Sequence, residues 1–470
     1  MSQTPQSEND RPDARVESET TATDETAAET ATKATAEATE ATEGQSEKAA
    51  APEKRRTFWL PLLLILIGVA TLFVVALTNF YPNENGRTRL FSEGLMPVRV
   101  AADEGNAWGY MNKAGEIAIA PAWDAASEFT ESGLAAVKRG DKWGYINKKG
   151  ELVLDFAYEE ADDFADNGLA AVKRDGLWGY IDKKGAQVIA PQFDDACGFA
   201  DNGLALVAQN GLCGYIDRRG KFKIPLQFSS AVSFDASGRA AVCVGGKWGM
   251  IGRSGKFLIN PRFDADFSFA ENGLAAVKCD GLWGYIDRRG NYAVSPAFRA
   301  AGDFAENGLA PVLTDEGKYG YINKKGKFAV APIYDHALAF ADNGLAAVCV
   351  SDQVGLWGYI DKKGKFAIAP TYRDASSFSC GLAAVRDENG YFYIDRKGGE
   401  IFRTEGLSVA TRFARDGYAV VRCYTLYRYD TGETVPILTG YEIVDTSGKV
   451  VNAQTVTGLS PRHLAYAFLP

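Results

Sequence analysis

The chain has 470 residues, of which 46% are apolar and 12% aromatic, and a formal charge of −9 from 51 Lys and Arg against 60 Asp and Glu. This balance argues against a protein dedicated to double-stranded nucleic acid, which needs an excess of basic side chains. The two histidines, His336 and His463, leave little room for histidine-based metal or acid–base chemistry. Length alone suggests about three domains, but the repeat described below overrides that estimate.

Residues 1–57 are predicted to form a disordered acidic tail rich in Ala, Thr and Glu. The first 53 residues contain 13 Asp and Glu and 4 Lys and Arg, so they carry the whole net charge of the chain. No Phe, Trp, Tyr, Leu or Ile precedes Phe58. Such a segment buries too little apolar surface to offset the entropy of ordering it. We interpret the segment as a flexible tail without a further role, and a tail that is phosphorylated for a function is the alternative.

Residues 58–80 are predicted to form a transmembrane helix, because these 23 residues carry no charge. At about 1.5 Å per residue they are long enough to cross the roughly 30 Å hydrocarbon core. Residues 54–56 (Lys-Arg-Arg) flank the N-terminal end, whereas the next basic residue on the other side is Arg87. By the positive-inside rule we expect a single-pass protein of the cytoplasmic membrane with a cytoplasmic N-terminus. Everything after the span would be extracellular or periplasmic; a cleaved signal peptide and a twin-arginine export signal are the alternatives.

The remainder of the chain repeats itself with a period of 35 residues. Residues 81–93 are interpreted as a linker, residues 94–405 as nine repeat units, and residues 406–470 as a degenerate repeat or C-terminal cap. A representative unit is residues 168–202. A Trp-Gly pair marks most units, and we predict that its tryptophan fills a structural core between units. These tryptophans are Trp108, Trp143, Trp178, Trp248, Trp283 and Trp357.

The recurring Trp-Gly-Tyr-Ile core with its flanking turns resembles the WG-repeat (KWG) family of bacterial proteins, over most of the chain that follows the apolar segment. The resemblance implies a repeat architecture and a bacterial origin, but no shared reaction and no catalytic residue. The sequence departs from the family pattern at Cys213 and Tyr319, which replace Trp, and at Gly252, which replaces Asp. Residues 154–158 (LDFAY) also depart from it, since other units have Ala-Pro there.

Each unit is predicted to consist of short β-strands and tight turns. Apolar residues alternate over four to six positions, which indicates strands, and Gly or Pro recurs too often for helix. The turn at residues 182–185 places Asp first and Gly fourth, as in a type I turn followed by a left-handed glycine. A second turn, Asp-Asn-Gly, ends at Gly203. The segment with Phe193, Ala196 and Phe199 is interpreted as an irregular connector or a short fourth strand.

We therefore expect an all-β fold built from tandem β-meander repeats of about 35 residues. One meander cannot bury both faces of its aromatic rings, so neighbouring units must stack. The glycine between Trp and Tyr is expected to leave room for an adjoining backbone or ring. Nine or ten units exceed the usual four to eight propeller blades, and the unit is short for a blade. These rules favour an open twisted superhelix, with a β-propeller as the alternative.

Pairs of basic residues occupy equivalent turn tips in six units, and a regular stack would align them in a basic ridge. Such a ridge could bind anionic envelope polymers or lipid headgroups through its summed field. Ordinary solvated hairpin tips that prevent edge-to-edge aggregation are the alternative. The residues of this possible ligand-binding ridge are Lys148, Lys149, Lys183, Lys184, Arg218, Arg219, Arg288, Arg289, Lys324, Lys325, Lys362 and Lys363.

Acidic residues recur at another position of the unit and raise the question of catalysis. Two carboxylates could form a glycosidase pair, but recurrence in nearly every unit points to a structural role. The seven cysteines are dispersed without a metal-binding spacing, and we interpret them as small apolar residues and not as a disulfide framework. We therefore expect no catalytic residue, no cofactor and no metal site. The acidic residues are Asp162, Asp163, Asp194, Asp195, Asp303 and Asp335.

The sequence thus predicts a non-catalytic, membrane-anchored β-repeat protein that presents an extended binding or scaffolding surface outside the cytoplasmic membrane. Its expected partners are the lipid bilayer, through residues 58–80, and proteins or anionic envelope polymers, but no nucleic acid. An envelope polysaccharide hydrolase or lyase that uses repeat-borne carboxylates is the alternative, and a passive spacer is a third possibility.

Overall fold

The computed structural model describes residues 89–102, 105–350, 355–428, 434–452 and 454–459, which belong to one compact unit of the chain. The predicted acidic tail, the predicted transmembrane segment and most of the predicted linker lie outside these described residues. Across these ranges the secondary structure is β, and none of it is a helix that could span a membrane.

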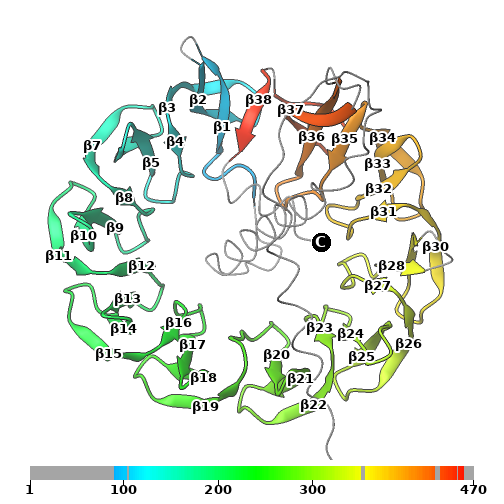
Figure 1. Ribbon diagram of the computed structural model, residues 1–470. Helices are drawn as coiled ribbons and strands as arrows, with labels where there is room; N and C mark the ends of the chain where they lie inside the picture. Colours follow the sequence, from blue (N-terminus) through cyan, green and yellow to red (C-terminus); the bar gives the residue numbers. More distant parts are fainter. Residues whose placement is uncertain (1–88, 103–104, 351–354, 429–433, 453, 460–470) are drawn as a thin grey trace, which may run out of the picture. The chain divides into compact units, whose positions relative to one another are not determined.

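The described residues form nine open sheets, and most of these contain four antiparallel strands (Figure 1). A representative sheet consists of β8 (Glu160–Ala161), β9 (Leu169–Arg174), β10 (Leu177–Asp182) and β11 (Gln187–Phe193). We number the strands of each sheet first to fourth in this order. In Figure 1 the first strands lie toward the centre of the array and the fourth strands toward its periphery. The all-β class and the tandem β-meander repeats predicted from the sequence are confirmed.

The strands of the other sheets follow the same order. The first strands are β4 (Ala125–Ala126), β12 (Asp195–Phe199), β16 (Ser230–Ala231), β23 (Ala300–Ala301), β27 (His336–Ala337), β31 (Asp374–Ala375) and β35 (Leu407–Ala410). The second strands are β1 (Leu95–Ala102), β5 (Leu134–Arg139), β13 (Ala205–Gln209), β17 (Arg239–Val244), β20 (Leu274–Cys279), β24 (Leu309–Leu313), β28 (Ala346–Val350), β32 (Ala383–Asp387) and β36 (Tyr418–Arg428). The third strands are β2 (Gly105–Asn112), β6 (Lys142–Asn147), β14 (Leu212–Ile216), β18 (Lys247–Gly252), β21 (Leu282–Asp287), β25 (Tyr319–Asn323), β29 (Leu356–Ile360), β33 (Gly390–Ile394) and β37 (Thr434–Asp445). The fourth strands are β3 (Ile117–Trp123), β7 (Leu152–Tyr158), β15 (Phe222–Phe228), β19 (Phe257–Phe263), β22 (Tyr292–Phe298), β26 (Phe328–Tyr334), β30 (Phe366–Tyr372) and β34 (Glu400–Arg403). The last strand of the described residues is β38 (Val456–Leu459).

The hydrophobic cores lie between neighbouring sheets. Ala171 of β9 packs with Tyr180 and with Val207 of the next sheet, whereas Ala170 and Val172 pack toward the preceding sheet. Both faces of the second and third strands are therefore buried, and a single unit has no core of its own. This arrangement is the stacking that the aromatic content of the units requires.

In most sheets a tyrosine hydroxyl forms a hydrogen bond to the next sheet along the chain. The Tyr180 side chain, on β10, is fully buried, and its hydroxyl donates to the carbonyl of Cys197 on β12 at 2.8 Å. Burial raises the pKa of Tyr180 well above its usual value, so the phenol stays protonated and remains a donor. The same bond recurs at Tyr110, Tyr145, Tyr215, Tyr285, Tyr321, Tyr359 and Tyr393.

The connector with the aromatic-x-x-Ala-x-x-Phe pattern crosses from the fourth strand of one sheet to the first strand of the next. It contributes a short strand, usually of two residues, which confirms the expectation of a short additional strand. The exception is the sheet β20-β21-β22, which has three strands. In the connector that leads to it, Asp266 stands where other units have Ala, and Met250 replaces the bridging tyrosine of the preceding sheet.

The first and last strands of the described chain meet in one sheet, whose order is β3-β2-β1-β38-β37-β36-β35. Val98 of β1 pairs with Leu459 of β38, and Figure 1 shows these two strands side by side. An open superhelix would keep the first and last units apart. The pairing is what the alternative, a propeller-like ring, requires, and it replaces the preference for the superhelix. The usual four to eight blades of a propeller were a misleading limit, because the described chain forms nine sheets and its end strands still pair.

Glycine has its predicted roles in the Trp-Gly-Tyr segment and in the turns. A Cβ on Gly179 would lie 2.6 Å from the carbonyl oxygen of Ile189, so only glycine allows β10 and β11 to approach at the bulge near Pro191. At the turn, Gly185 has a φ of 77°. The Asp182 carboxylate accepts hydrogen bonds from the N–H groups of Lys184 and Ala186, both at 2.9 Å. These bonds make the tip between the third and fourth strands a rigid turn.

Candidate binding surfaces

The tryptophans assigned to the repeat core lie at its border. The side chains of Trp108, Trp143, Trp178, Trp248, Trp283 and Trp357 are half-buried and pack against the inter-sheet clusters. The fully buried ring in most units is the tyrosine two residues later, as Tyr180 is in its unit. The reason is geometric: Tyr180 pairs with Ala171 in the middle of β9, whereas Trp178 pairs with Lys173 near its end.

The basic tips are exposed and fixed in direction by their turns. All twelve basic side chains of the predicted ridge are exposed to solvent: Lys148, Lys149, Lys183, Lys184, Arg218, Arg219, Arg288, Arg289, Lys324, Lys325, Lys362 and Lys363. The pairs were found from the sequence because they recur. Four further exposed basic residues stand at these tips: Lys113 and Arg253, which are single, and the mixed pair Arg396 and Lys397, which a pattern of identical pairs does not include. We call this set of tips the basic rim.

Neighbouring tips contact the Asp-Asn-Gly type of turn in the preceding unit. The Arg218 guanidinium donates to the carbonyl of Asn167 at 2.8 Å, and Lys148 pairs with Glu93 at 2.6 Å. Both kinds of turn therefore lie at the same end of the sheets. The hairpin between the second and third strands, such as the one around Asp175, lies at the opposite end, because each strand runs from one end to the other. We call that end the far rim.

The described chain starts at the basic rim. The Phe91 N–H donates to the Asp416 carboxylate at 2.9 Å, and the Phe91 ring packs edge-on against Tyr418 with 4.8 Å between centroids. Asp416 belongs to the turn just before β36, which corresponds to the Asp-Asn-Gly turn of the regular units.

The repeated acidic residues take part in structural bonds. Asp194 accepts from the N–H of Asn210 at 2.6 Å and thereby caps the β13–β14 hairpin, and Asp335 pairs with Lys318 at 2.6 Å. Asp162 accepts from the N–H of Gly198 at 3.1 Å, which links two successive units. These bonds give the recurrent carboxylates a structural role within and between units. Two further acidic residues of the predicted set also accept hydrogen bonds: Asp163 from the Ser127 hydroxyl at 2.7 Å, and Asp195 from the N–H of Ala196 at 2.9 Å. Burial raises the pKa of Asp303.

The seven cysteines are free thiols, so no disulfide joins the described units. Cys243 and Cys349 are buried, and Cys380 is exposed. Cys197, next to the first-strand residue Ala196, has a pKa raised to about 11 by burial. A thiol with such a pKa is a poor nucleophile at neutral pH.

A cavity of about 640 Å³ lies at the far rim between the sheet β31-β32-β33-β34 and strands β35, β36 and β37. Its volume is in the range of ordinary ligand sites. Sequence reasoning missed it, because it lies where the repeat ends and no residue of it recurs at the same position in every unit. Its walls come from the β32–β33 hairpin on one side and from the last sheet on the other. Its lining includes Arg373, Arg386, Tyr391, Leu407, Tyr424 and Pro436.

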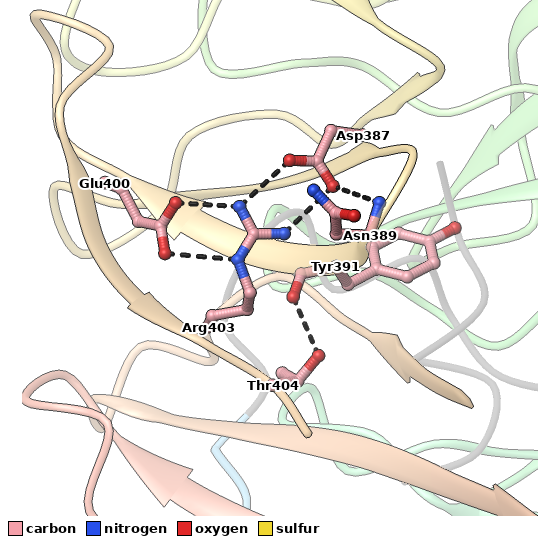
Figure 2. A network of polar contacts seen from close by, with 6 residues as sticks. All are labelled: Asp387, Asn389, Tyr391, Glu400, Arg403 and Thr404. Atoms are coloured by element: carbon pink, nitrogen blue, oxygen red, sulfur yellow. Dashed lines mark hydrogen bonds and ion pairs between the residues drawn. The ribbon is translucent and has the colours of Figure 1, made fainter. Parts of the chain in front are cut away.

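A polar network holds the β32–β33 wall of this cavity in place (Figure 2). The Arg403 guanidinium makes two bonds of 2.9 Å to the Asp387 carboxylate and one of 2.8 Å to Glu400. Asp387 in turn accepts from the N–H of Asn389 at 2.8 Å, which closes the hairpin. The hydrogen bonds that Arg403 donates, together with its positive charge, hold the pKa of Asp387 below its usual value. The hairpin is therefore braced in a single position.

Comparison with solved structures gives remote likenesses. A crystal structure of a eukaryotic initiation factor has 11% sequence identity and a TM-score of 0.41, and the match covers 66% of this chain and 96% of that one. Hsv2 of Kluyveromyces lactis has 10% identity and a TM-score of 0.31, over 51% of this chain and 95% of that one. BamB of Moraxella catarrhalis has 12% identity and a TM-score of 0.29, over 69% and 92%. At these values the likenesses carry no conclusion about this chain.

Comparison with curated proteins gives no match. The family model of the WG containing repeat, in contrast, matches eight successive segments. These segments are residues 108–143, 143–178, 178–213, 214–248, 248–283, 283–319, 319–352 and 357–392. Together they cover more than half of the 470 residues and have the period found from the sequence. The chain belongs to the WG-containing-repeat family.

Proposed function

We propose that this chain is a non-catalytic, membrane-anchored binding protein. Its array of repeats presents the basic rim to phosphate-bearing surfaces outside the cytoplasmic membrane. The observation that carries the proposal is the position of the rim. Exposed Lys and Arg side chains occupy the same turn position in successive units, at the end of the sheets where Phe91 is bonded to Asp416.

The expected membrane span supports this orientation. Residues 58–80 form an uncharged stretch, and residues 81–88, which connect it to the described unit, can extend over at most about 30 Å. An anchor of that length would keep the basic rim close to the headgroups. Basic residues near an anionic surface contribute about 1 kcal/mol each, and the attraction is screened within a Debye length. The structural bonds of the repeated acids support the non-catalytic part of the proposal.

The test measures binding of the full chain, held in phosphatidylcholine nanodiscs, to immobilised phosphatidylcholine vesicles with and without phosphatidylglycerol, and to a soluble polyphosphate polymer. The variant Lys148→Ser/Lys149→Ser removes two charges from the basic rim. Its matched control, Arg139→Ser/Lys142→Ser, removes two exposed charges from the far rim of the same sheet. We expect the first variant to bind anionic vesicles several-fold more weakly at low salt, and the control to bind like the unmodified chain.

Extending the substitutions to all six pairs should weaken binding to the anionic surface further, and the remaining single tips should account for what is left. Equal losses in the rim variant and its control would contradict the proposal, because the attraction would then follow net charge alone. Binding of the polyphosphate without binding of the vesicles would identify a polymer as the ligand, whereas the reverse would identify lipid headgroups.

The expected location has a test of its own. A protease added to intact bacterial cells that express the full chain should degrade the repeat unit. Protection of the repeat unit in intact cells, with degradation only after the membrane is broken, would contradict the external location.

A further inference from the structure

The cavity at the far rim lies where the units lose their regular form. The fourth strand of the last regular unit, β34, has four residues, compared with seven in β30, and β36 and β37 have 11 and 12 residues, compared with five in β32 and β33. The long β36–β37 hairpin therefore extends past its neighbours. The strand β35 pairs with β36 only as far as Leu407 and Tyr424.

One face of these strands carries a continuous row of exposed apolar side chains. Leu407 pairs with Tyr424, Tyr424 pairs with Leu438, and Leu426 pairs with Pro436. Residues directly opposite each other, and alternate residues along a strand, share a face of the sheet. Leu407, Leu426 and Leu438 are 49%, 58% and 39% exposed, which is unusual for three leucines on one face. We call these five residues the apolar strip; Leu407, Tyr424 and Pro436 also line the cavity.

The opposite wall of the cavity carries charges of both signs at its edge, because Asp387 and Glu388 line it together with two arginines. Arg373, which directly precedes β31, and Arg386, which lies on β32, are both exposed. The Arg386 guanidinium lies 5.8 Å from the centroid of the Tyr391 ring, and the Arg373 guanidinium pairs with the exposed Glu388 at 3.2 Å. Exposed pairs of this kind contribute little and exchange easily for another carboxylate.

The wall itself is pre-organised. Besides the Asp387–Arg403–Glu400 network in Figure 2, the Tyr391 hydroxyl donates to Asp374, and the Thr404 hydroxyl donates to the Tyr391 carbonyl at 2.8 Å. A ligand that enters the cavity therefore meets a fixed surface, and little ordering of the protein opposes binding.

We propose that the cavity and the apolar strip bind an extended peptide segment of a partner protein, with apolar side chains at alternate positions and an acidic residue beside them. Alternate side chains of an extended peptide are spaced like those of the strip, since both follow strand geometry. The acidic residue complements Arg373 and Arg386. The aliphatic character of Leu407, Leu426, Pro436 and Leu438 favours a peptide over an oligosaccharide, which would need more polar partners. This proposal does not depend on the proposed function of the basic rim, because the cavity lies at the opposite end of the sheets.

The experiment selects short peptides from a displayed random library on the full chain in detergent. The enriched peptides are then measured by fluorescence polarisation against four variants. Leu426→Ser and Arg386→Glu change the strip and the charged wall. Leu258→Ser and Arg139→Glu are matched controls, because Leu258 is 46% exposed on β19 and Arg139 is exposed on β5. All four side chains are at the surface, so the melting temperature should stay unchanged.

We expect the enriched peptides to combine apolar and acidic residues. Leu426→Ser and Arg386→Glu should each weaken their binding by about tenfold or more, as central contacts of an interface do, and the controls should leave it unchanged. Arg386→Lys should restore part of the affinity and its salt dependence. A lack of enrichment, or equal binding to Leu426→Ser and to its control, would overturn the proposal. Self-association of the unmodified chain that Leu426→Ser abolishes, or binding of neutral oligosaccharides at the same residues, would also overturn it in favour of a second copy or a glycan.

Discussion

At the scale of the residue, the buried tyrosine of the Trp-Gly-Tyr segment contributes more to the assembly than the tryptophan that marks the repeat. Its ring fills the space between two sheets, and its hydroxyl satisfies a carbonyl of the next unit, as Tyr180 does for Cys197. The tryptophan is easy to recognise in the sequence because it is a rare residue, but a rare residue is not necessarily a buried one.

Tyr180→Phe should therefore destabilise the protein by about 1 kcal/mol, because the substitution leaves a buried carbonyl without its donor. The free energy of unfolding is measured by chemical denaturation. Tyr292→Phe is the control: this ring is 40% exposed, and surface changes usually stay within about 0.5 kcal/mol. Equal stability of Tyr180→Phe and the unmodified protein would show that the hydroxyl bond is dispensable.

A second prediction concerns Asp387, whose pKa in the folded protein is lowered by its hydrogen bonds with Arg403. A carboxyl whose folded pKa is depressed stabilises the fold above its unfolded pKa of about 4, and this contribution disappears as the pH falls through the folded value. Asp387→Asn should thus lower stability at about pH 6, and the gap to the unmodified protein should narrow toward about pH 3. Denaturation midpoints across this range provide the measurement, and a gap that is independent of pH would contradict the assignment.

At the scale of the element, the first strand of each sheet depends on two positions that belong to different segments of the unit. The sheet β20-β21-β22 lacks this strand, and both Met250 and Asp266 differ from the pattern there. Without a hydroxyl at residue 250 the connector loses its bond to the preceding sheet, and a carboxylate at residue 266 disfavours burial at the position of Ala196 in the regular unit.

The edge of β20 should accordingly exchange its amide hydrogens faster than the edge of β9, which is covered by β8. Hydrogen–deuterium exchange followed by mass spectrometry compares peptides from residues 274–279 with peptides from residues 169–174. Equal protection of the two strands would mean that the connector shields β20 without pairing.

At the scale of the whole molecule, the pairing of β38 with β1 joins the two ends of the described chain. Val456 is fully buried in the cluster that both ends share, together with Val98 and Ile443. The seam is the place where the array can open, because elsewhere consecutive sheets are connected covalently.

Val456→Asp should therefore destabilise the protein by about 3 kcal/mol or more, since it buries a charge without a partner. Val188→Asp is the control, because Val188 lies on β11 and its side chain is 43% exposed. Small-angle scattering should detect a larger radius of gyration for Val456→Asp under conditions in which the control stays compact. An unchanged radius together with unchanged stability would contradict a closing role for β38.

The sequence by itself determined the repeat, its strands and its turns, because these depend on local chemistry: the alternation in WGYID, the left-handed Gly185 and the carboxylate of Asp182 act within a few residues. It also placed the basic tips, since identical turns must project at equivalent positions. Only the tertiary structure decided that the array closes, because the pairing of Val98 with Leu459 joins residues far apart in the sequence whose pattern differs from the repeat. The same holds for the cavity between Tyr391 and Leu407, which arises where one regular sheet meets an irregular one and leaves no periodic signal.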